Sequence, residues 1–257
     1  MWRDGKARVL IDAGGGSFVR FGEAGARMKD LNLVLFTHFH ADHSADLGAL
    51  VKSSFFEERE RPLPVLGPTG NARFPGASEF VRALFDGKHG AFRYLGDFLI
   101  EGRASYTIKA RDVRPADGEV RQIDAVDGFA VSAAKVTHGP VPAIAWRVEA
   151  GGASVVFSGD TNGDDGVLEK LARNADLFVA HNAVPEGAAG VERFLHMPPS
   201  VIGRIAAAAS VKRLVLSHRM QRTLGKEPET LKAVSEHYRG PISFAEDLDC
   251  FPLIPRS

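Results

Sequence analysis

Four side chains that commonly bind metal ions, His38, His40, Asp42 and His43, lie within the seven-residue segment THFHADH at 37–43. His38 and His40 are two residues apart at the end of an extended apolar run, so their side chains project to the same side. Asp42 and His43 follow where the chain turns toward a helix, which lets this second pair face an adjacent metal. A polar turn with unrelated histidines is the alternative, but packing alone does not require four such side chains together. The segment therefore predicts a metal site at the end of a strand.

Residues of the same kind end three other apolar runs. His138 ends FAVSAAKVTH, Asp160 ends ASVVFSGD and His218 ends KRLVLSH. Open sheets place their binding sites at the carboxyl ends of strands, which is where these residues are expected. Taken singly, each histidine has a plain alternative as a surface or capping residue, and Gly-Asp-Thr is often only a turn. Together with the 37–43 segment, they predict a joint metal site.

Composition narrows the chemistry of such a site. The single cysteine, Cys250, excludes an internal disulfide and a thiolate-rich zinc site, so the ligands are nitrogen and oxygen atoms. The 32 basic and 32 acidic residues balance, which argues against a large basic surface for nucleic acid. No apolar stretch is long enough to span a bilayer, so no membrane partner is expected. The N-terminus lacks the apolar stretch of a signal peptide, which favours a cytoplasmic location.

Short apolar runs alternate with helical segments, which is typical of layered α/β structure. No repeat, low-complexity tract or long linker interrupts the 257 residues, so a single domain over 1–257 is expected. The runs from 119 to 160 predict an antiparallel hairpin array. Helices are predicted over 77–85, from Pro199 to Ala209, and after Pro228 as far as a left-handed C-cap at Gly240. The stretch 87–114 predicts no clear element.

The order of these residues, HxHxDH followed by His, Asp and His, resembles the metallo-β-lactamase superfamily from about Val9 to His218. The resemblance implies an α/β (α+β) fold, a four-layer αβ/βα sandwich, with two metal ions sharing a bridging hydroxide. The nitrogen and oxygen donors favour two Zn2+ per chain over iron or manganese. By this likeness one metal is held by His38, His40 and His138, the other by Asp42, His43 and His218, and Asp160 bridges them.

Asp12, in LIDAGGG, matches the strand-Asp-Gly element that these proteins carry near their metals. We expect its carboxylate to accept a hydrogen bond from a ligand histidine and so orient the ring. The alternative is a residue that only forms the turn at the end of a strand.

Within the superfamily, the chain resembles the branch of ribonuclease Z and its phosphodiesterase and arylsulfatase-like relatives. Three features carry this likeness: SGDT at 158–161, AHNA at 180–183 in the place of the His-Glu-Ala-Thr segment, and His196 in LHMPP. Asn182 replaces the glutamate of that segment. Only 21 residues separate His138 from Asp160, too few for the arm with which these ribonucleases grip tRNA. This argues against tRNA as a partner.

His196 lies shortly before the helix that Pro199 opens, where free N–H groups and the helix dipole favour an anion. We expect it to donate a proton to the leaving oxygen, and we assign Asp42, Asp160 and His196 as the residues that take part in catalysis. A loop histidine satisfied by the backbone is the alternative. His181 is expected to face the core or the ligands rather than a metal.

The expected function is hydrolysis of a phosphodiester or a related ester by the metal-activated hydroxide, with a small-molecule ester as the substrate. An arylsulfatase or a lactonase is the alternative within enzymes, because the same hydroxide attacks sulfur or a carbonyl carbon. A binding protein that keeps the fold without metals is the alternative outside enzymes, and the complete ligand set argues against it.

Relatives usually begin with a strand bearing a Leu-Gly-Thr-Gly turn, and this chain opens almost directly on the run at 7–12. We expect the natural product to be longer at its N-terminus, in which case a periplasmic location is open. A missing strand would leave an exposed sheet edge, which invites formation of a homodimer.

Overall fold

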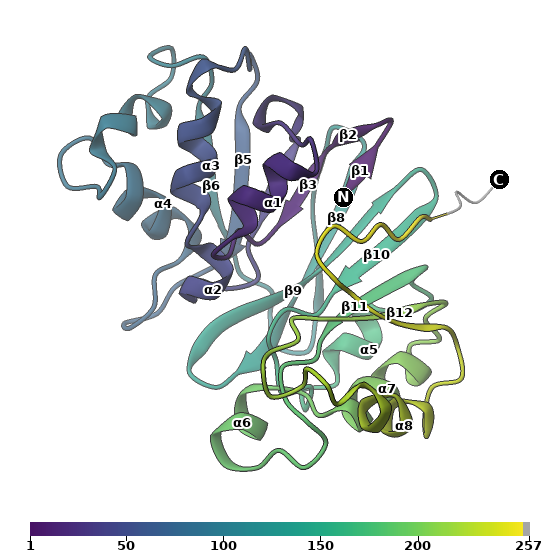
Figure 1. Ribbon diagram of the computed structural model, residues 1–257. Helices are drawn as coiled ribbons and strands as arrows, with labels where there is room; N and C mark the ends of the chain where they lie inside the picture. The colour runs from purple at the N-terminus through teal and green to yellow at the C-terminus, as the bar shows by residue number, and fades with distance from the viewer. Residues whose placement is uncertain (254–257) are drawn as a thin grey trace. The chain divides into compact units, whose positions relative to one another are not determined.

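The computed structural model describes residues 1–253. The chain separates into an N-terminal unit, residues 1–114, and a C-terminal unit that starts at Pro115. Both units are drawn in Figure 1. The single domain over 1–257 stays a prediction.

A four-stranded parallel sheet forms the centre of the N-terminal unit, in the order β3-β4-β5-β6. Its strands are β3 (Val9–Ile11), β4 (Leu33–Leu35), β5 (Leu63–Pro68) and β6 (Ile108–Val113). The apolar run of β4 is wholly buried, as strands of a parallel sheet usually are. Because all four strands run in one direction, the residues that follow β3, β4 and β5 leave the sheet at the same edge.

Helices pack on this sheet and complete its core. Leu47, Leu50 and Val51 of α3 and Val81 and Phe85 of α4 are buried in one cluster with strand residues. The helical elements are α1 (Ser17–Glu23), η1 (Met28–Asp30), α2 (Ala41–Ser44), α3 (Leu47–Ser53), η2 (Ser54–Phe56), α4 (Ala77–Phe85) and η3 (Arg93–Leu99). A small hairpin of β1 (Trp2–Arg3) and β2 (Lys6–Ala7) precedes them.

The C-terminal unit is built on a seven-stranded sheet in the order β13-β12-β11-β10-β9-β8-β7. Its strands are β7 (Val120–Val126), β8 (Phe129–His138), β9 (Val141–Ala150), β10 (Ala153–Phe157), β11 (Leu177–His181), β12 (Leu214–Ser217) and β13 (Ile242–Phe244). The first four form the predicted antiparallel array.

Strand direction decides where the polar residues of this unit gather. β8 and β10 are both antiparallel to β9, and β11 and β12 are parallel to β10. These four strands therefore run the same way, and their carboxyl ends share one edge of the sheet. His138, Asp160, His181 and His218 stand at the end of β8, after β10, at the end of β11 and after β12.

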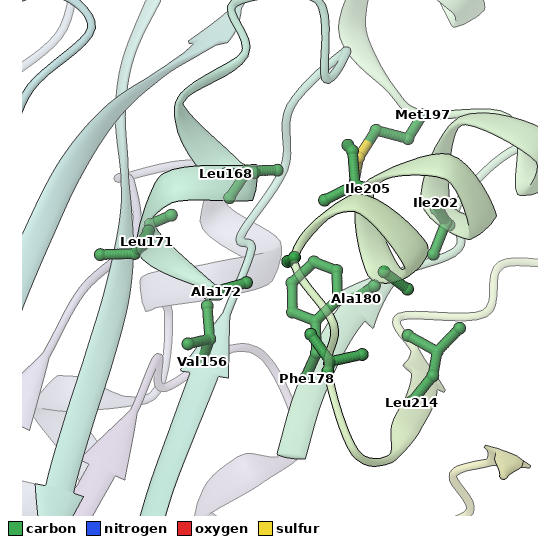
Figure 2. Close-up of a cluster of buried hydrophobic side chains, with 14 of the residues drawn as sticks. Val156, Leu168, Leu171, Ala172, Phe178, Ala180, Met197, Ile202, Ile205 and Leu214 are labelled. Atoms are coloured by element: carbon green, nitrogen blue, oxygen red, sulfur yellow. The ribbon is translucent and has the colours of Figure 1, made fainter. Parts of the chain in front are cut away.

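Helices α5 (Val167–Leu171), α6 (Gly190–Leu195), α7 (Pro199–Ala208) and α8 (Glu227–Ser235) belong to the same unit. Leu168 and Leu171 of α5, Ile202 and Ile205 of α7 and Phe178 of β11 belong to one buried cluster, part of which is drawn in Figure 2. This core fixes the edge from which the polar residues project. α7 also approaches α8 closely, because a Cβ at Gly203 would meet the Val234 carbonyl oxygen.

Several predicted elements are confirmed, and the predicted end of the last helix is wrong. The helix over 77–85 has the predicted bounds, and Pro199 occupies the first turn of α7. α8 ends at Ser235, and Gly240 is not among the glycines with positive φ. A Cβ at Gly240 would collide with the Tyr238 ring, so this position needs space rather than left-handed backbone. The stretch 87–114 holds η3 and β6.

Across residues 1–253, no helix combines the length and the apolar character that crossing a membrane requires.

Candidate metal centre

Three histidine rings of the N-terminal unit lie against one another just beyond β4. The ring centroids of His38 and His40 are 4.7 Å apart, and those of His38 and His43 are 4.0 Å apart. Phe39, between the first two, packs its ring on Phe36 and Phe80 at 5.2 and 4.7 Å. Side chains alternate along extended backbone. Anchoring Phe39 in this aromatic cluster therefore directs both neighbouring histidines away from it.

Asp12 ties this histidine group to β3. Its Oδ1 accepts the Thr37 backbone N–H at 2.7 Å, and its Oδ2 accepts the Thr37 hydroxyl at 2.7 Å and lies 2.8 Å from His43 Nδ1. A carboxylate can only accept, so His43 carries its proton on Nδ1 and presents Nε2 as a ligand nitrogen. Asp12 adopts φ +57°, a left-handed conformation that only the surrounding contacts hold in place.

The C-terminal unit gathers four histidines around one carboxylate. Asp160 Oδ2 lies 3.8 Å from His138 Nε2 and 3.7 Å from His196 Nδ1. Asp160 Oδ1 lies 2.8 Å from His181 Nδ1 and 3.9 Å from His218 Nε2. The two oxygens of this buried carboxylate thus face different pairs of histidines. A carboxylate that contacts two metal ions, one through each oxygen, would have this arrangement.

His138 is oriented from behind by α6. Its Nδ1 lies 2.9 Å from the Leu195 carbonyl oxygen, which can only accept, so Nε2 is the nitrogen turned toward Asp160. The close approach depends on Gly139, since a Cβ there would meet the side chains of Phe194 and Leu195. Gly163 similarly leaves room for Met197, so the segment 194–197 is seated on two glycines.

His196, within this segment, is buried, and its Nδ1 makes no hydrogen bond. Burial lowers the pKa of the His196 imidazole to about 4, because the charged form loses its solvation. The negative charge of Asp160 opposes this effect, whereas the neighbouring His138 and His218 add to it. At neutral pH the ring is therefore uncharged.

Each unit brings together the site residues predicted within it. In the N-terminal unit, His38, His40 and His43 form one group, and the Asp42 side chain stands beside His43 at 3.9 Å, 56% exposed. In the C-terminal unit, the predicted residues all surround the Asp160 carboxylate; they are His138, His196 and His218.

Two contributors to these groups were not predicted. Thr37 contacts Asp12 and also His38, whose Nδ1 lies 3.1 Å from the Thr37 hydroxyl. The other is the Leu195 carbonyl, which sequence cannot reveal because it is backbone. The hydrogen-bond contact of His181 with Asp160 agrees with its expected place near the ligands. This place could be inferred from the sequence, because His181 ends β11, which is parallel to β12, the strand before His218.

The donor geometry fits a metal ion within each unit. His38 Nε2 and His40 Nδ1 are 3.1 Å apart, close to the roughly 3.3 Å that separates two nitrogens bound to one tetrahedral zinc. In the C-terminal unit, His138 and Asp160 each offer one ligand atom, and these two atoms lie within 4.8 Å of each other. Imidazole nitrogen with carboxylate oxygen is a donor set that zinc and related divalent ions accept.

A family model described as the β-lactamase superfamily domain matches residues 7–219. The chain belongs to the metallo-β-lactamase superfamily. This confirms the family and the fold class expected from the resemblance. The superfamily and its His and Asp clusters indicate a divalent metal.

Ribonuclease Z of Mycobacterium bovis (strain BCG / Pasteur 1173P2) is 31% identical over 272 residues, which cover 99% of this chain and 91% of that protein. The short form of human tRNase Z has a TM-score of 0.71 at 20% identity, covering 98% of this chain and 91% of that one. A diphosphatase from the PhnP family has a TM-score of 0.63 at 20% identity, covering 99% and 84%. At such identities the two structures support the fold alone. Membership of the superfamily and the similarity to ribonuclease Z together confirm the prediction that the protein is a metal-dependent hydrolase.

The prediction about substrate and partners is wrong. It expected a small-molecule ester and argued against tRNA, whereas the similar curated relatives are ribonucleases Z. The premise about the arm was sound, because β8 joins β9 through the two-residue turn at 139–140. The conclusion did not follow, since contacts to RNA phosphates are spread over a surface and do not depend on one insertion.

Proposed function

We propose that this protein is a metal-dependent ribonuclease that hydrolyses a phosphodiester bond in tRNA precursors. The observation that carries this proposal is the 31% identity to ribonuclease Z over 99% of the chain. We also propose that the two units form one domain, since the matching family model runs from residue 7 to residue 219 and so includes parts of both.

Two Zn2+ ions are the proposed cofactor. The resemblance to the superfamily assigns seven ligands, of which His38, His40 and His138 would hold one ion, Asp42, His43 and His218 the other, and Asp160 both. The spacing of the His38 and His40 nitrogens supports a shared ion in the N-terminal unit. The two oxygens of the Asp160 carboxylate face different histidines, His138 and His218, which supports a bridging role for Asp160. When bound, such ions polarise a phosphoryl oxygen and lower the pKa of water.

The chain's own residues prepare the ligand atoms. The Asp12 carboxylate fixes the proton of His43 on Nδ1, and the Leu195 carbonyl fixes that of His138 on Nδ1. Both imidazoles therefore present Nε2 without having to change tautomer. Hydrogen bonds of this kind raise the basicity of a ligand imidazole and hold its ring at a constant angle.

His196 is the proposed proton donor to the leaving ribose oxygen. Its imidazole is neutral in the free protein because burial lowers its pKa to about 4. A phosphodiester carries a negative charge, which would raise that pKa again and let the ring take up a proton as the substrate binds. Asn182, which stands where the ribonuclease segment has glutamate, is buried and carries no charge, so the negative charge near the His196 ring comes from Asp160 and the bound phosphodiester.

The test uses a 5′-labelled tRNA precursor with a 3′ trailer, incubated with zinc-loaded protein. We expect one cut at the trailer junction, loss of cutting after chelation, and recovery on adding Zn2+. Asp160→Asn and His138→Ala should lose the cut, whereas His237→Ala, a change of an exposed histidine, should retain it.

Two outcomes would overturn the proposal. One is a zinc-loaded, folded protein that leaves the precursor intact while hydrolysing an aryl sulfate or a lactone. The other is cutting that survives both chelation and the Asp160→Asn change, because the cut would then come from a contaminating nuclease.

A further inference from the structure

The segment 69–76 connects β5 to α4 and leaves the sheet at the edge where the histidines of the N-terminal unit stand. β3, β4 and β5 are parallel, so this segment follows the third strand as Asp12 follows the first and His38 the second. A Cβ at Gly67, near the end of β5, would meet the Phe39 ring, which shows how closely the two strand ends approach. Loops at this edge are where an α/β sheet binds its substrates.

Hydrogen bonds hold this segment in one shape. Asn71 Oδ1 accepts the backbone N–H groups of Arg73 and Phe74 at 2.9 and 3.0 Å, and the Asn71 N–H donates to the Phe74 carbonyl at 2.9 Å. The two ends of the loop nearly touch, because a Cβ at Gly70 would meet the Gly76 nitrogen. A loop ordered in advance loses little entropy when a ligand binds to its tip.

The tip carries an aromatic ring and a guanidinium beside a proposed metal ligand. The Phe74 ring is partly buried, and its centroid lies 6.0 Å from that of His40 at an interplanar angle of 67°. The Arg73 guanidinium carbon lies 5.9 Å from the centroid of the Phe74 ring. Arg73 is exposed, and no carboxylate of residues 1–253 forms an ion pair with it. Packing accounts for Phe74, but it gives no reason for an unpaired cation at this position.

We propose that Arg73 and Phe74 bind the RNA nucleotide next to the scissile phosphate, with Phe74 stacking on its base and Arg73 contacting a phosphate. This inference rests on the proposed ribonuclease function and assigns the residues that hold its substrate. Single-stranded RNA offers flat bases and phosphates together, and aromatic and guanidinium side chains are the groups that recognise them. Stacking accepts any base, so the pair gives affinity without a strict sequence requirement.

The test compares Phe74→Leu, which removes the ring but keeps an apolar side chain, and Arg73→Gln, which removes the charge. The matched controls are Phe18→Leu on α1 and Arg82→Gln on α4, both exposed positions. Steady-state kinetics use the zinc-loaded enzyme and the labelled tRNA precursor. We expect Phe74→Leu to raise KM by about 5- to 150-fold, which corresponds to the roughly 1 to 3 kcal/mol of one stacked base, with kcat nearly unchanged.

Salt dependence gives a second measurement, which a purely structural role would not affect. A phosphate contact contributes about one unit to the slope of log(kcat/KM) against log salt concentration, so Arg73→Gln should lower the slope by about one. Neither control should change KM or the slope. The zinc content and thermal unfolding of every variant are measured in parallel.

The outcomes separate the inference from the function on which it rests. If the wild type cuts the precursor and both variants keep its KM and salt slope, the inference is wrong and the function stands. If Phe74→Leu lowers zinc content instead of RNA affinity, Phe74 only braces His40, and the inference is again wrong. If the wild type neither binds nor cuts the precursor, the proposed function has failed.

Discussion

The hydrogen bond from His43 to Asp12 gives a direct test of how the ligands are prepared. Asp12→Asn keeps Oδ1, which accepts the Thr37 N–H, and replaces Oδ2 by an amide that donates. Asparagine tolerates the left-handed backbone of this position, φ +57°, so little backbone strain is added. The change therefore acts mainly on the tautomer of His43.

The expected magnitude follows from this reversal. With an N–H group facing Nδ1, the neutral ring places its own proton on Nε2, the nitrogen that we assign to the metal. Removing such an outer partner usually lowers metal affinity by about 10- to 100-fold, which corresponds to about 1.4 to 2.7 kcal/mol. The Thr37 N–H keeps its bond to Oδ1, and the Thr37 hydroxyl can rotate to accept a hydrogen bond from the new amide. The free energy of unfolding of the metal-free protein should therefore fall by less than this.

The assay is a zinc competition titration against a chromophoric chelator, with the imidazole tautomer of His43 read from nitrogen-15 shifts. Asp46→Asn is the matched control, because Asp46 accepts the Phe18 backbone N–H and contacts no histidine of the group. Unchanged zinc affinity in Asp12→Asn, with His43 still protonated on Nδ1, would refute the reasoning.

Three further predictions concern the C-terminal unit. His196→Ala should lower the rate of RNA cleavage by roughly 10²- to 10⁴-fold but that of a nitrophenyl phosphodiester far less, since a good leaving group needs no proton; equal losses in the two kinetic assays would count against the general acid. The metal-free protein should lose about 1 to 2 kcal/mol of stability as pH falls from 6.5 to about 4, less than the full pKa shift would give because solvent partly screens the His196 ring. The unfolded state takes up the His196 proton in that range and the folded state does not, so in urea titrations at several pH values His196→Asn should flatten this part of the curve. Ile202→Ala, in the core of α7, should cost about 2 to 5 kcal/mol in urea unfolding, whereas Val191→Ala, at a 72% exposed position, should change little.

The sequence predicts which of the proposed ligands lie together in each unit, because these residues follow recognisable strands. The apolar runs before His38, His138, Asp160 and His218 are all strands in the structure. Within each sheet, the common direction of these strands then brings their carboxyl ends to one edge of that sheet.

Other features depend on tertiary contacts that no local pattern carries. The helix expected from His43 is broken at Asp46, whose carboxylate accepts the Phe18 N–H from a distant segment. α5 begins only at Val167, because Gly166 takes φ +66° immediately before it. The position of His196 depends on Gly139 and Gly163, which leave room for the segment 194–197. These contacts join residues that are far apart in the chain.

The substrate was predicted incorrectly because the prediction rested on a missing insertion. Surfaces that bind RNA are assembled from scattered side chains, and their absence cannot be read from the length of one connection. The Arg73 and Phe74 pair illustrates this, since neither residue belongs to a recognisable pattern and their meaning comes from the neighbouring His40 ring.

The common direction of β8, β10, β11 and β12 leaves the opposite edge of the seven-stranded sheet without ligands. That edge carries the tight turns at 127–128 and 151–152, whose four residues all have positive φ. A ten-residue strand such as β8 holds its two ends about 30 Å apart. A peptide tag or reporter domain grafted into either turn would therefore project far from Asp160, giving a handle for immobilising the enzyme with its histidines undisturbed.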